Sequence, residues 1–385
     1  MKNHTRTKRR KKRVLKKRIF IIIPLLLVAI IGGLYLFHLN STAKSAANEA
    51  HDDNSVYKNK KSDLRDKMPD PKFDNVSILM MGVDSGEGDK RDKDDEARTD
   101  ALMLATLNKD DKSVKLLSIP RDSYVYVPEV GYETKINHAH SFGGPKATID
   151  TVENLLGIPV DYYARINFSA FMDVVDAVDG VTVDVPYEFT EQDSSDKPDK
   201  VHLYEGEQEL DGEEALAFAR TRKMDSDVER GKRQQEILQA LLTKALSVKS
   251  VLKYDDVIDS IGKNMKTNMT YKEMKSFFGY LTKGTGIDID TLSIDGVDYQ
   301  PGNVYYWQLD DRSLAKNINI MEEHLEIPVT DFGYDFSEDE EDDGEDVESE
   351  GENGVTDEQE TPQGEQPPID GTDGQLEDND GELIE

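Results

Sequence analysis

A stretch near the middle of the chain, residues 220 to 235, concentrates arginine in an otherwise acidic protein. Ser226 or Asp227 can cap a helix here, and i, i+3 and i+4 spacing then places three polar side chains on one face of its first turns. Two arginines just before the helix point the same way. The five side chains that share this direction are Arg220, Arg222, Arg230, Arg233 and Gln234.

Arginine in the first turn of a helix opposes the helix dipole unless an anion is bound there. Its planar guanidinium also binds phosphate oxygens in pairs, which an ammonium group does less well. The stretch therefore predicts a site for a phosphate-bearing ligand. The competing interpretation is an ion-pair network with neighbouring acids such as Glu213 and Glu229.

A second group of charges lies at the ends of three predicted strands. If these strands form an antiparallel meander, Asp84, Asp100 and Arg121 fall at one edge of the sheet, and the loop before the second strand brings Arg98 beside Asp100. Two converging carboxylates suit Mg²⁺, with Mn²⁺ as the alternative ion, completed by water and substrate phosphates. Taken singly, Asp84 also fits a turn residue and Asp100 an ion pair with Arg98.

The elements that position these residues alternate between strands and helices along residues 73 to 333. The predicted strands cover residues 76–83, 101–107, 114–119, 160–166 and 181–185, and the predicted helices cover residues 145–156, 169–179, 211–219, 228–248, 254–265 and 271–283. The expected fold class is α/β: a single three-layer α-β-α domain with a mixed central sheet and no second core.

The segments outside this block differ sharply in composition, although the whole chain carries a formal charge of -32. Residues 1–18 are basic and should stay in the cytoplasm, and residues 19–39 form a charge-free transmembrane helix; a cleaved signal peptide is the rival interpretation. Residues 40–72 are interpreted as a stalk. Residues 334–385 hold twenty-three acids and no lysine or arginine, which predicts a disordered tail. The chain has no cysteine, so disulfide and thiol chemistry are excluded.

Two further patterns carry weaker signals. His138 and His140 are spaced as two zinc ligands on a strand would be, but no third ligand is evident. The apolar helix over residues 169–179 more often indicates core packing than a lipid tunnel.

With these residues in hand, the block resembles the LytR-CpsA-Psr family of cell-envelope proteins over about residues 74 to 300. The likeness rests on the joint order and spacing of ILMMGVDS, RTDALMLATL, LLSIPRDSYV, KINHAHSFGG, INFSAFMDVVDAVDGVTVDV and LDGEEALAFARTRKMDSDVERGKRQQ. The long charged loop between Asp84 and Asp100 departs from the family pattern, and the acidic tail lies outside the family core.

The resemblance implies a transferase of Gram-positive cell-wall assembly. It would move a glycopolymer, such as wall teichoic acid or capsular polysaccharide, from a polyprenyl pyrophosphate carrier onto peptidoglycan. Asp84 and Asp100 would hold Mg²⁺, and the prenyl chain would enter a hydrophobic tunnel. The residues implied around the pyrophosphate are Arg98, Arg121, Arg220, Arg222, Arg230 and Gln234.

The expected chemistry is attack of a peptidoglycan hydroxyl on the phosphorus next to the glycan, which needs mainly positioning and charge neutralisation. The general base is left unassigned. The alternatives are a non-catalytic membrane-bound regulator or glycan binder, and a polyprenyl pyrophosphate phosphatase that uses water as acceptor. Direct nucleic-acid recognition is excluded, because about eighteen cytoplasmic residues cannot fold a reading module. The sequence predicts a single-pass type II membrane protein with its catalytic domain outside the cell, and it leaves the oligomeric state open.

Overall fold

The computed structural model describes residues 41–52, 61–83, 97–223, 227–245, 265–281 and 288–336. The chain divides into two units, residues 1–335 and residues 336–385. In the second unit the structure describes Phe336 alone. Every element named below belongs to the first unit.

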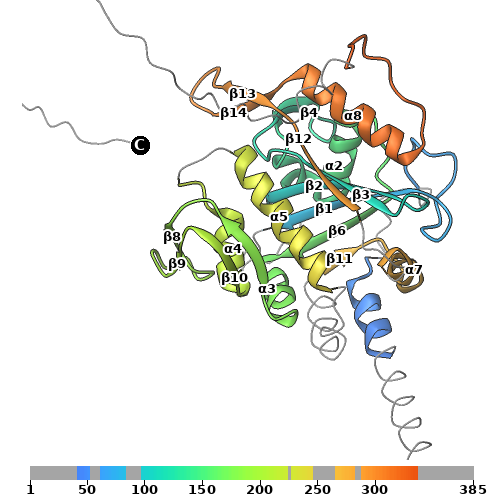
Figure 1. Ribbon diagram of the computed structural model, residues 1–385. Coiled ribbons are helices and arrows are strands. Elements are labelled where there is room, and N and C mark those ends of the chain that lie inside the picture. The colour runs from blue at the N-terminus through green and yellow to red at the C-terminus, as the bar shows by residue number, and fades with distance from the viewer. Residues whose placement is uncertain are drawn as a thin grey trace, which may run out of the picture. The chain divides into compact units, whose positions relative to one another are not determined.

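A mixed six-stranded sheet, in the order β11-β6-β1-β2-β3-β12, forms the centre of the first unit (Figure 1). Its strands in that order are β11 (Met265–Thr267), β6 (Tyr162–Asn167), β1 (Val76–Val83), β2 (Thr99–Asn108), β3 (Ser113–Ser118) and β12 (Asp288–Ser293). The expected antiparallel meander of β1, β2 and β3 is confirmed. β6 and β12 run parallel to β1 and β3, so the sheet is mixed as predicted.

Alternation along β1 divides its apolar side chains between the two faces of the sheet. Leu79 and Met81 belong to one buried cluster, whereas Ile78 and Met80 pack against another. The helices that pack on the first face are α2 (His138–Leu156) and α8 (Asp311–Leu325), and those on the second are α5 (Asp227–Ala245) and α7 (Tyr271–Leu281). Helices therefore cover both faces of the sheet.

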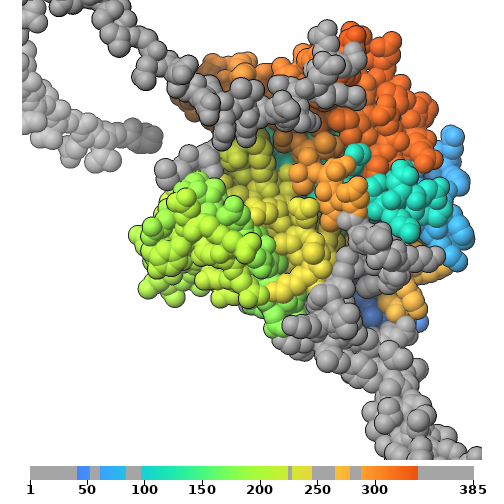
Figure 2. All heavy atoms as spheres, viewed as in Figure 1, coloured from blue at the N-terminus to red at the C-terminus, as the bar shows by residue number. Residues whose placement is uncertain are grey.

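A second hydrophobic cluster lies beside the sheet, in a lobe that includes the predicted elements at 169–179, 181–185 and 211–219 but was not expected to have a core of its own (Figure 2, green). The lobe consists of α3 (Phe168–Ala177), β7 (Val181–Val185), β8 (Phe189–Glu191), β9 (Val201–Leu203), β10 (Gly206–Leu210) and α4 (Gly212–Arg220). Among the described residues, its strands pair as β7 with β10 and as β8 with β9. Helix α5 joins the lobe to the sheet, because Ile237 is buried in the lobe while Leu238 packs against the sheet.

Two hairpins lie at the edge of the sheet where β3 ends. They are β4 (Tyr124–Val127) with β5 (Tyr132–Lys135), and β13 (Gly296–Tyr299) with β14 (Tyr306–Leu309). Ser123 bridges to Trp307, and the Trp307 backbone N–H donates to the Asp122 carbonyl oxygen at 2.9 Å. The hairpins are therefore fastened to each other directly after β3.

The predicted stalk is wrong where the structure describes it. Residues 41–50 are helical, and Ala46, Ala47 and Ala50 are buried. Further along, Arg65 donates two hydrogen bonds, of 2.9 and 2.7 Å, to the buried carboxylate of Asp161. Asp52 also donates its backbone N–H to the Thr267 carbonyl oxygen at 2.8 Å. Buried alanines and polar contacts of this kind do not produce the strong apolar period that marks an element in a sequence.

Several predictions fall outside the described residues: the basic segment 1–18, the membrane helix 19–39, the tail from residue 337 and most of the helix at 254–265. That last prediction is wrong at its end, since Met265 begins β11. Within the described ranges, no helix is both long and apolar enough to cross a bilayer.

Candidate active site

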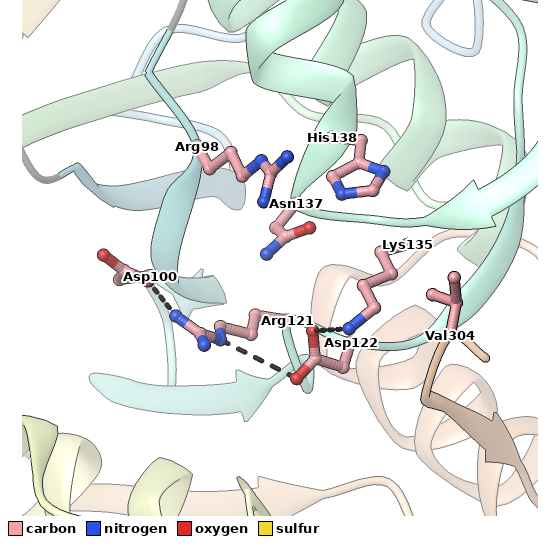
Figure 3. A pocket seen from close by; sticks show the side chains of 8 residues that line it. All are labelled: Arg98, Asp100, Arg121, Asp122, Lys135, Asn137, His138 and Val304. Atoms are coloured by element: carbon pink, nitrogen blue, oxygen red, sulfur yellow. Dashed lines mark hydrogen bonds and ion pairs between the residues drawn. The ribbon is translucent and has the colours of Figure 1, made fainter. Parts of the chain in front are cut away.

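A cavity of about 320 Å³ opens at the sheet edge where β2 begins and β3 ends (Figure 3). It combines residues from the start of β2, the turn after β3, the end of β5, the start of α2 and the β13–β14 loop. The lining residues are Arg98, Asp100, Arg121, Asp122, Lys135, Asn137, His138 and Val304. The edge at which Asp100 and Arg121 were expected to meet is therefore the wall of a cavity.

Arg121 and Asp100 form an ion pair across this edge, as Figure 3 shows. Arg121 stands three residues beyond β3, held in place by the Asn137 backbone N–H, which donates to its carbonyl oxygen at 3.2 Å. The Nε atom of Arg121 is buried and makes no hydrogen bond within the described part of the chain. An unsatisfied buried donor is unfavourable, so this atom suits an incoming anion.

Asp122 neutralises much of the positive charge around the cavity. Its carboxylate is only 7% exposed and accepts a hydrogen bond of 2.9 Å from Lys135. Arg121 Nε and an Arg222 nitrogen lie 3.8 and 3.7 Å from its Oδ2 atom. Burial by itself raises the pKa of Asp122, but the Lys135 hydrogen bond and the charges of the three cations outweigh it, so this pKa lies below its ordinary value.

His138 and Asn137 form the wall contributed by the start of α2. Burial lowers the pKa of His138, and the charges of Arg98 and Lys135 lower it further, with a smaller opposing effect from Asp122. A neutral imidazole is therefore favoured, and its Nδ1 atom lies 3.0 Å from the Thr134 hydroxyl. The side-chain oxygen of Asn137 is buried and accepts no hydrogen bond from the described residues.

The arginine-rich stretch divides between the cavity and the lobe. Arg222 approaches the cavity through Asp122, whereas Arg220 donates to the carbonyl oxygens of Gln192 and Asp193 in the lobe, at 3.2 and 3.0 Å. A capping box at Asp211 starts α4, the helix that ends at Arg220. The sequence predicted five phosphate ligands on one surface. In the structure, Arg222 lies near the cavity, whereas Arg220 binds the lobe.

The three predicted ligands on α5 are buried or bonded to the backbone. Arg233 donates to the carbonyl oxygens of Phe218 and Thr221 at 3.1 and 2.7 Å, and Gln234 donates to that of Ala219 at 3.1 Å. These contacts join the start of α5 to the end of α4. Arg230 is 5% exposed in the first turn of α5. None of the three lines the cavity, and their role as pyrophosphate ligands stays a prediction.

Gly231 explains how α5 comes so near the end of β3. A Cβ atom at this position would overlap the Ser118 hydroxyl. Gln235, one turn further, donates to the Leu116 and Leu292 carbonyl oxygens at 2.7 and 2.8 Å, across the β3 and β12 pair. The helix is therefore fixed to the sheet within one turn of its arginines.

A metal ion has partial support in the donor set. No group of three or more His, Asp or Glu residues is arranged to hold a metal within the ranges that the structure covers. Asp84 lies outside those ranges, directly after Val83, which pairs with Thr99. Asp100 gives Oδ1 to Arg121, and its Oδ2 accepts no hydrogen bond from described residues. A carboxylate oxygen at the edge of this cationic cavity fits Mg²⁺, which is commonly held by one or two carboxylates, waters and substrate phosphates.

Sequence reasoning missed four polar residues of the cavity: Asp122, Lys135, Asn137 and His138. Asp122 follows Arg121 directly, and the other three surround the point where a short strand meets α2. The dense polar run in KINHAH was noticed only as a weak zinc pattern. In the structure His138 lines the cavity, whereas the Nδ1 atom of His140 lies 2.7 Å from the Ala97 carbonyl oxygen.

The comparisons with known proteins agree with this fold. The family model described as the LytR_cpsA_psr family matches residues 35–323. A protein of Bacillus subtilis (strain 168) named polyisoprenyl-teichoic acid–peptidoglycan teichoic acid transferase TagT is 41% identical over 315 residues, which is 80% of this chain and 95% of that protein.

Two solved structures extend the similarity to the fold. One, named "TagT bound to LIIa-WTA", is 38% identical with a TM-score of 0.58 and covers 69% of this chain and 97% of that one. The other, named "LytR-CPS2A-psr family protein YwtF (TagT) with bound octaprenyl pyrophosphate lipid", is 35% identical with a TM-score of 0.55 and covers 71% of this chain and 99% of that one.

Proposed function

This chain belongs to the LytR_cpsA_psr family, and we propose that it transfers a teichoic-acid-type glycopolymer from a polyprenyl pyrophosphate carrier to peptidoglycan. A relative that shares 41% of its residues carries the name of this activity, and a solved structure of the same fold is named with octaprenyl pyrophosphate bound. The partners are then the lipid-linked glycopolymer, peptidoglycan and membrane lipid.

One observation carries the proposal: the cavity presents three cations around a space of a few hundred cubic ångströms. Arg98, Arg121 and Lys135 line it against two carboxylates, and Arg222 stands at its border. The buried Nε of Arg121 donates no hydrogen bond to any described residue, and a phosphate oxygen could accept one. The cavity volume of about 320 Å³ is large enough for a pyrophosphate group.

The residues of the cavity act by position and charge. Arg121 and Arg98 neutralise the oxygens of the group being transferred, which is the main requirement of phosphoryl transfer. Asp122 holds Lys135 and Arg121 in place, and its lowered pKa together with its three cations makes it a poor proton acceptor. The general base stays unassigned.

A bound Mg²⁺, or Mn²⁺ in its place, fits the free edge of Asp100, with Asp84 as the second expected carboxylate. The ion would supply charge neutralisation at the phosphate oxygens. Asp100 would then have two roles: one carboxylate oxygen orients Arg121, and the other would bind the metal ion.

The membrane helix at residues 19–39 belongs to the same proposal. A type II anchor would hold the cavity on the outer side of the membrane in which the lipid carrier resides. Its 21 residues lie outside the described part of the chain and would be tested by extracting the protein from membranes with salt and with detergent.

Arg121→Ala tests the site. We expect transfer to fall by at least a hundredfold, the loss typical of removing a preorganised group that stabilises transition-state charge. Product masses would be measured with a short-chain lipid-linked glycan donor, Mg²⁺ and peptidoglycan oligomers. Lys67→Ala, at an exposed ion pair, is the matched control. Wild-type turnover in Arg121→Ala would reject the assignment.

The same assay separates the alternatives. A binder would retain the pyrophosphate carrier without releasing prenyl monophosphate, and a phosphatase would release it without coupling the glycan to peptidoglycan. Chelation should abolish turnover and added Mg²⁺ should restore it. Full activity in chelator would reject the metal role of Asp100.

A further inference from the structure

Four tyrosines gather on the two hairpins beside the cavity. They are Tyr124 of β4, Tyr299 of β13, Tyr306 of β14 and Tyr305 directly before it, and we call them the tyrosine patch. The Tyr124 ring centroid lies 4.8 Å from that of Tyr306 and 5.4 Å from that of Tyr299. Residues more than 170 positions apart in the chain therefore build one aromatic surface.

Lys135 and Val304 join the tyrosine patch to the cavity. Lys135 binds Asp122 inside the cavity, and its Nζ atom lies 5.6 Å from the Tyr305 ring centroid and 5.9 Å from that of Tyr306. Val304 lines the cavity and directly precedes Tyr305. A ligand that leaves the cavity on this side therefore meets aromatic rings at once.

One ring of the tyrosine patch, that of Tyr305, is exposed, and the other three are half-buried. Tyr305 is 37% exposed, and its hydroxyl donates to Asp298 at 2.9 Å. Trp307, on the opposite side of β14 from Tyr306, packs against the main core and anchors the hairpin. An exposed aromatic ring backed by half-buried rings, with polar groups at its edge, suits ligands that have an apolar face and a hydroxyl rim. Pyranose sugars have that shape.

The geometry of phosphoryl transfer indicates whether the tyrosine patch would bind the sugars of the acceptor or those of the donor. In phosphoryl transfer the attacking oxygen and the leaving group lie roughly in line on opposite sides of the phosphorus. Figure 3 shows Asp100 with Arg121 on one side of the cavity, and Val304 with Lys135 on the other. If the departing prenyl phosphate lies on the arginine side, the attacking hydroxyl enters from the side of the tyrosine patch.

We infer that the tyrosine patch binds the acceptor, a glycan strand of peptidoglycan, by stacking its sugar rings beside Lys135. The inference rests on the proposed function, since it assigns the acceptor side of that reaction. Lys135 then serves both reactants: it neutralises charge in the cavity and faces the rings on which the acceptor lies.

The test uses the full-length chain and Tyr305→Ala. Acceptor kinetics would be measured with peptidoglycan glycan oligomers at saturating lipid-linked donor. We expect the KM for the acceptor to rise about tenfold with kcat little changed, because stacking is lost equally from the ground and transition states. Tyr305→Phe, which keeps the ring, should stay within about twofold of wild type.

Tyr204→Ala is the matched control, because this tyrosine is 59% exposed between β9 and β10 of the lobe. It should leave the acceptor KM unchanged. Thermal unfolding of each variant would confirm that Tyr305→Ala is folded. An unchanged acceptor KM in Tyr305→Ala would overturn the inference, and so would a rise in the donor KM instead, which would give the patch to the donor glycan.

Binding of the same glycan oligomers without donor, measured by titration calorimetry, separates the two proposals. Oligomer binding that weakens in Tyr305→Ala, in a protein that transfers nothing, would support the tyrosine patch and refute the transferase. Transfer at wild-type rate and acceptor KM in that variant would support the transferase and refute the patch.

Discussion

At the scale of single residues, Asp122 determines the charge balance of the cavity. Three cations approach its buried carboxylate, and its pKa is lowered despite the cost of burial. Its contribution to stability is therefore present above the unfolded pKa, near 3.8, and is lost as the pH falls through the lower folded value. The residue keeps Arg121 and Lys135 positioned before any phosphate arrives.

His324 provides a pH prediction far from the cavity. Burial, and next the charge of Lys115, lowers the pKa of His324 to about 4, although Asp111 and Asp290 oppose this. Its ring nitrogens lie 2.7 and 2.8 Å from the hydroxyls of Thr106 and Ser113. It joins α8 to β2 and β3 as a neutral group.

Because the unfolded histidine binds a proton near pH 6.5 and the folded one near 4, stability should fall as the pH drops through this window. The loss should be roughly 2 kcal/mol, less than the full shift because the surroundings keep some contact with water. Urea unfolding of wild type and His324→Gln between pH 4 and 7 would measure it. The slope should shrink in His324→Gln and persist in His202→Gln, an exposed control; equal slopes in all three would contradict the assignment.

At the scale of elements, the start of α5 is held from two sides. Arg233 and Gln234 fasten it to the end of α4, and Gly231 lets it approach β3. Two of the residues predicted to bind phosphate thus position the helix on which Arg230 also lies. An arginine that binds a carbonyl and one that binds a phosphate look the same in a sequence.

Gly231→Ala should disturb this contact. The added methyl group overlaps the Ser118 hydroxyl, so α5 or β3 has to shift, which typically costs about 1–3 kcal/mol. We expect lower stability and a larger loss of transfer, because a shift at Ser118 displaces the end of β3, three residues before Arg121 of the cavity. Denaturant unfolding and transfer kinetics would be compared with Gly231→Ala/Ser118→Ala, in which the overlapping oxygen is gone. Failure of the double variant to recover any of the loss would contradict the contact.

At the scale of the whole molecule, residues 41–72 belong to the folded domain wherever the structure describes them. Asp161 has no exposed surface, and Arg65 reaches it from this segment with two hydrogen bonds. The family match, which begins at residue 35, includes the same segment. A soluble protein that starts at residue 73 would therefore lack part of its fold.

Arg65→Ala should lower the free energy of unfolding by about 3–5 kcal/mol, because it leaves a buried carboxylate without its cation. A chain starting at residue 73 should lose at least as much relative to one starting at residue 41. Arg65→Ala/Asp161→Asn should recover part of the loss, and Lys67→Ala, whose ion pair is exposed, should cost under about 0.5 kcal/mol. Equal unfolding curves for the two chain lengths would instead support the interpretation of residues 40–72 as a stalk.

Much of the central sheet could be read from the chain. The strands at 76–83, 101–107, 114–119 and 160–166 were predicted within about two residues of β1, β2, β3 and β6, since buried strands leave long runs of β-branched and apolar residues. In the lobe, the predictions at 169–179, 181–185 and 211–219 match α3, β7 and α4, whereas β8, β9, β10 and the two hairpins were not predicted, because these strands are only three to five residues long. Helix α8 was also not predicted.

The sequence by itself determined the meander, the edge at which Asp100 meets Arg121, and the family. Each depends on local pattern: alternation, a short connection, and motifs in a fixed order. Only the tertiary structure decided that Asp122 and Lys135 share the cavity, that Arg233 bonds to α4, and that tyrosines from two distant hairpins stand beside Lys135. Those pairings depend on how helices and hairpins pack, and packing brings together residues whose separation along the chain carries no signal.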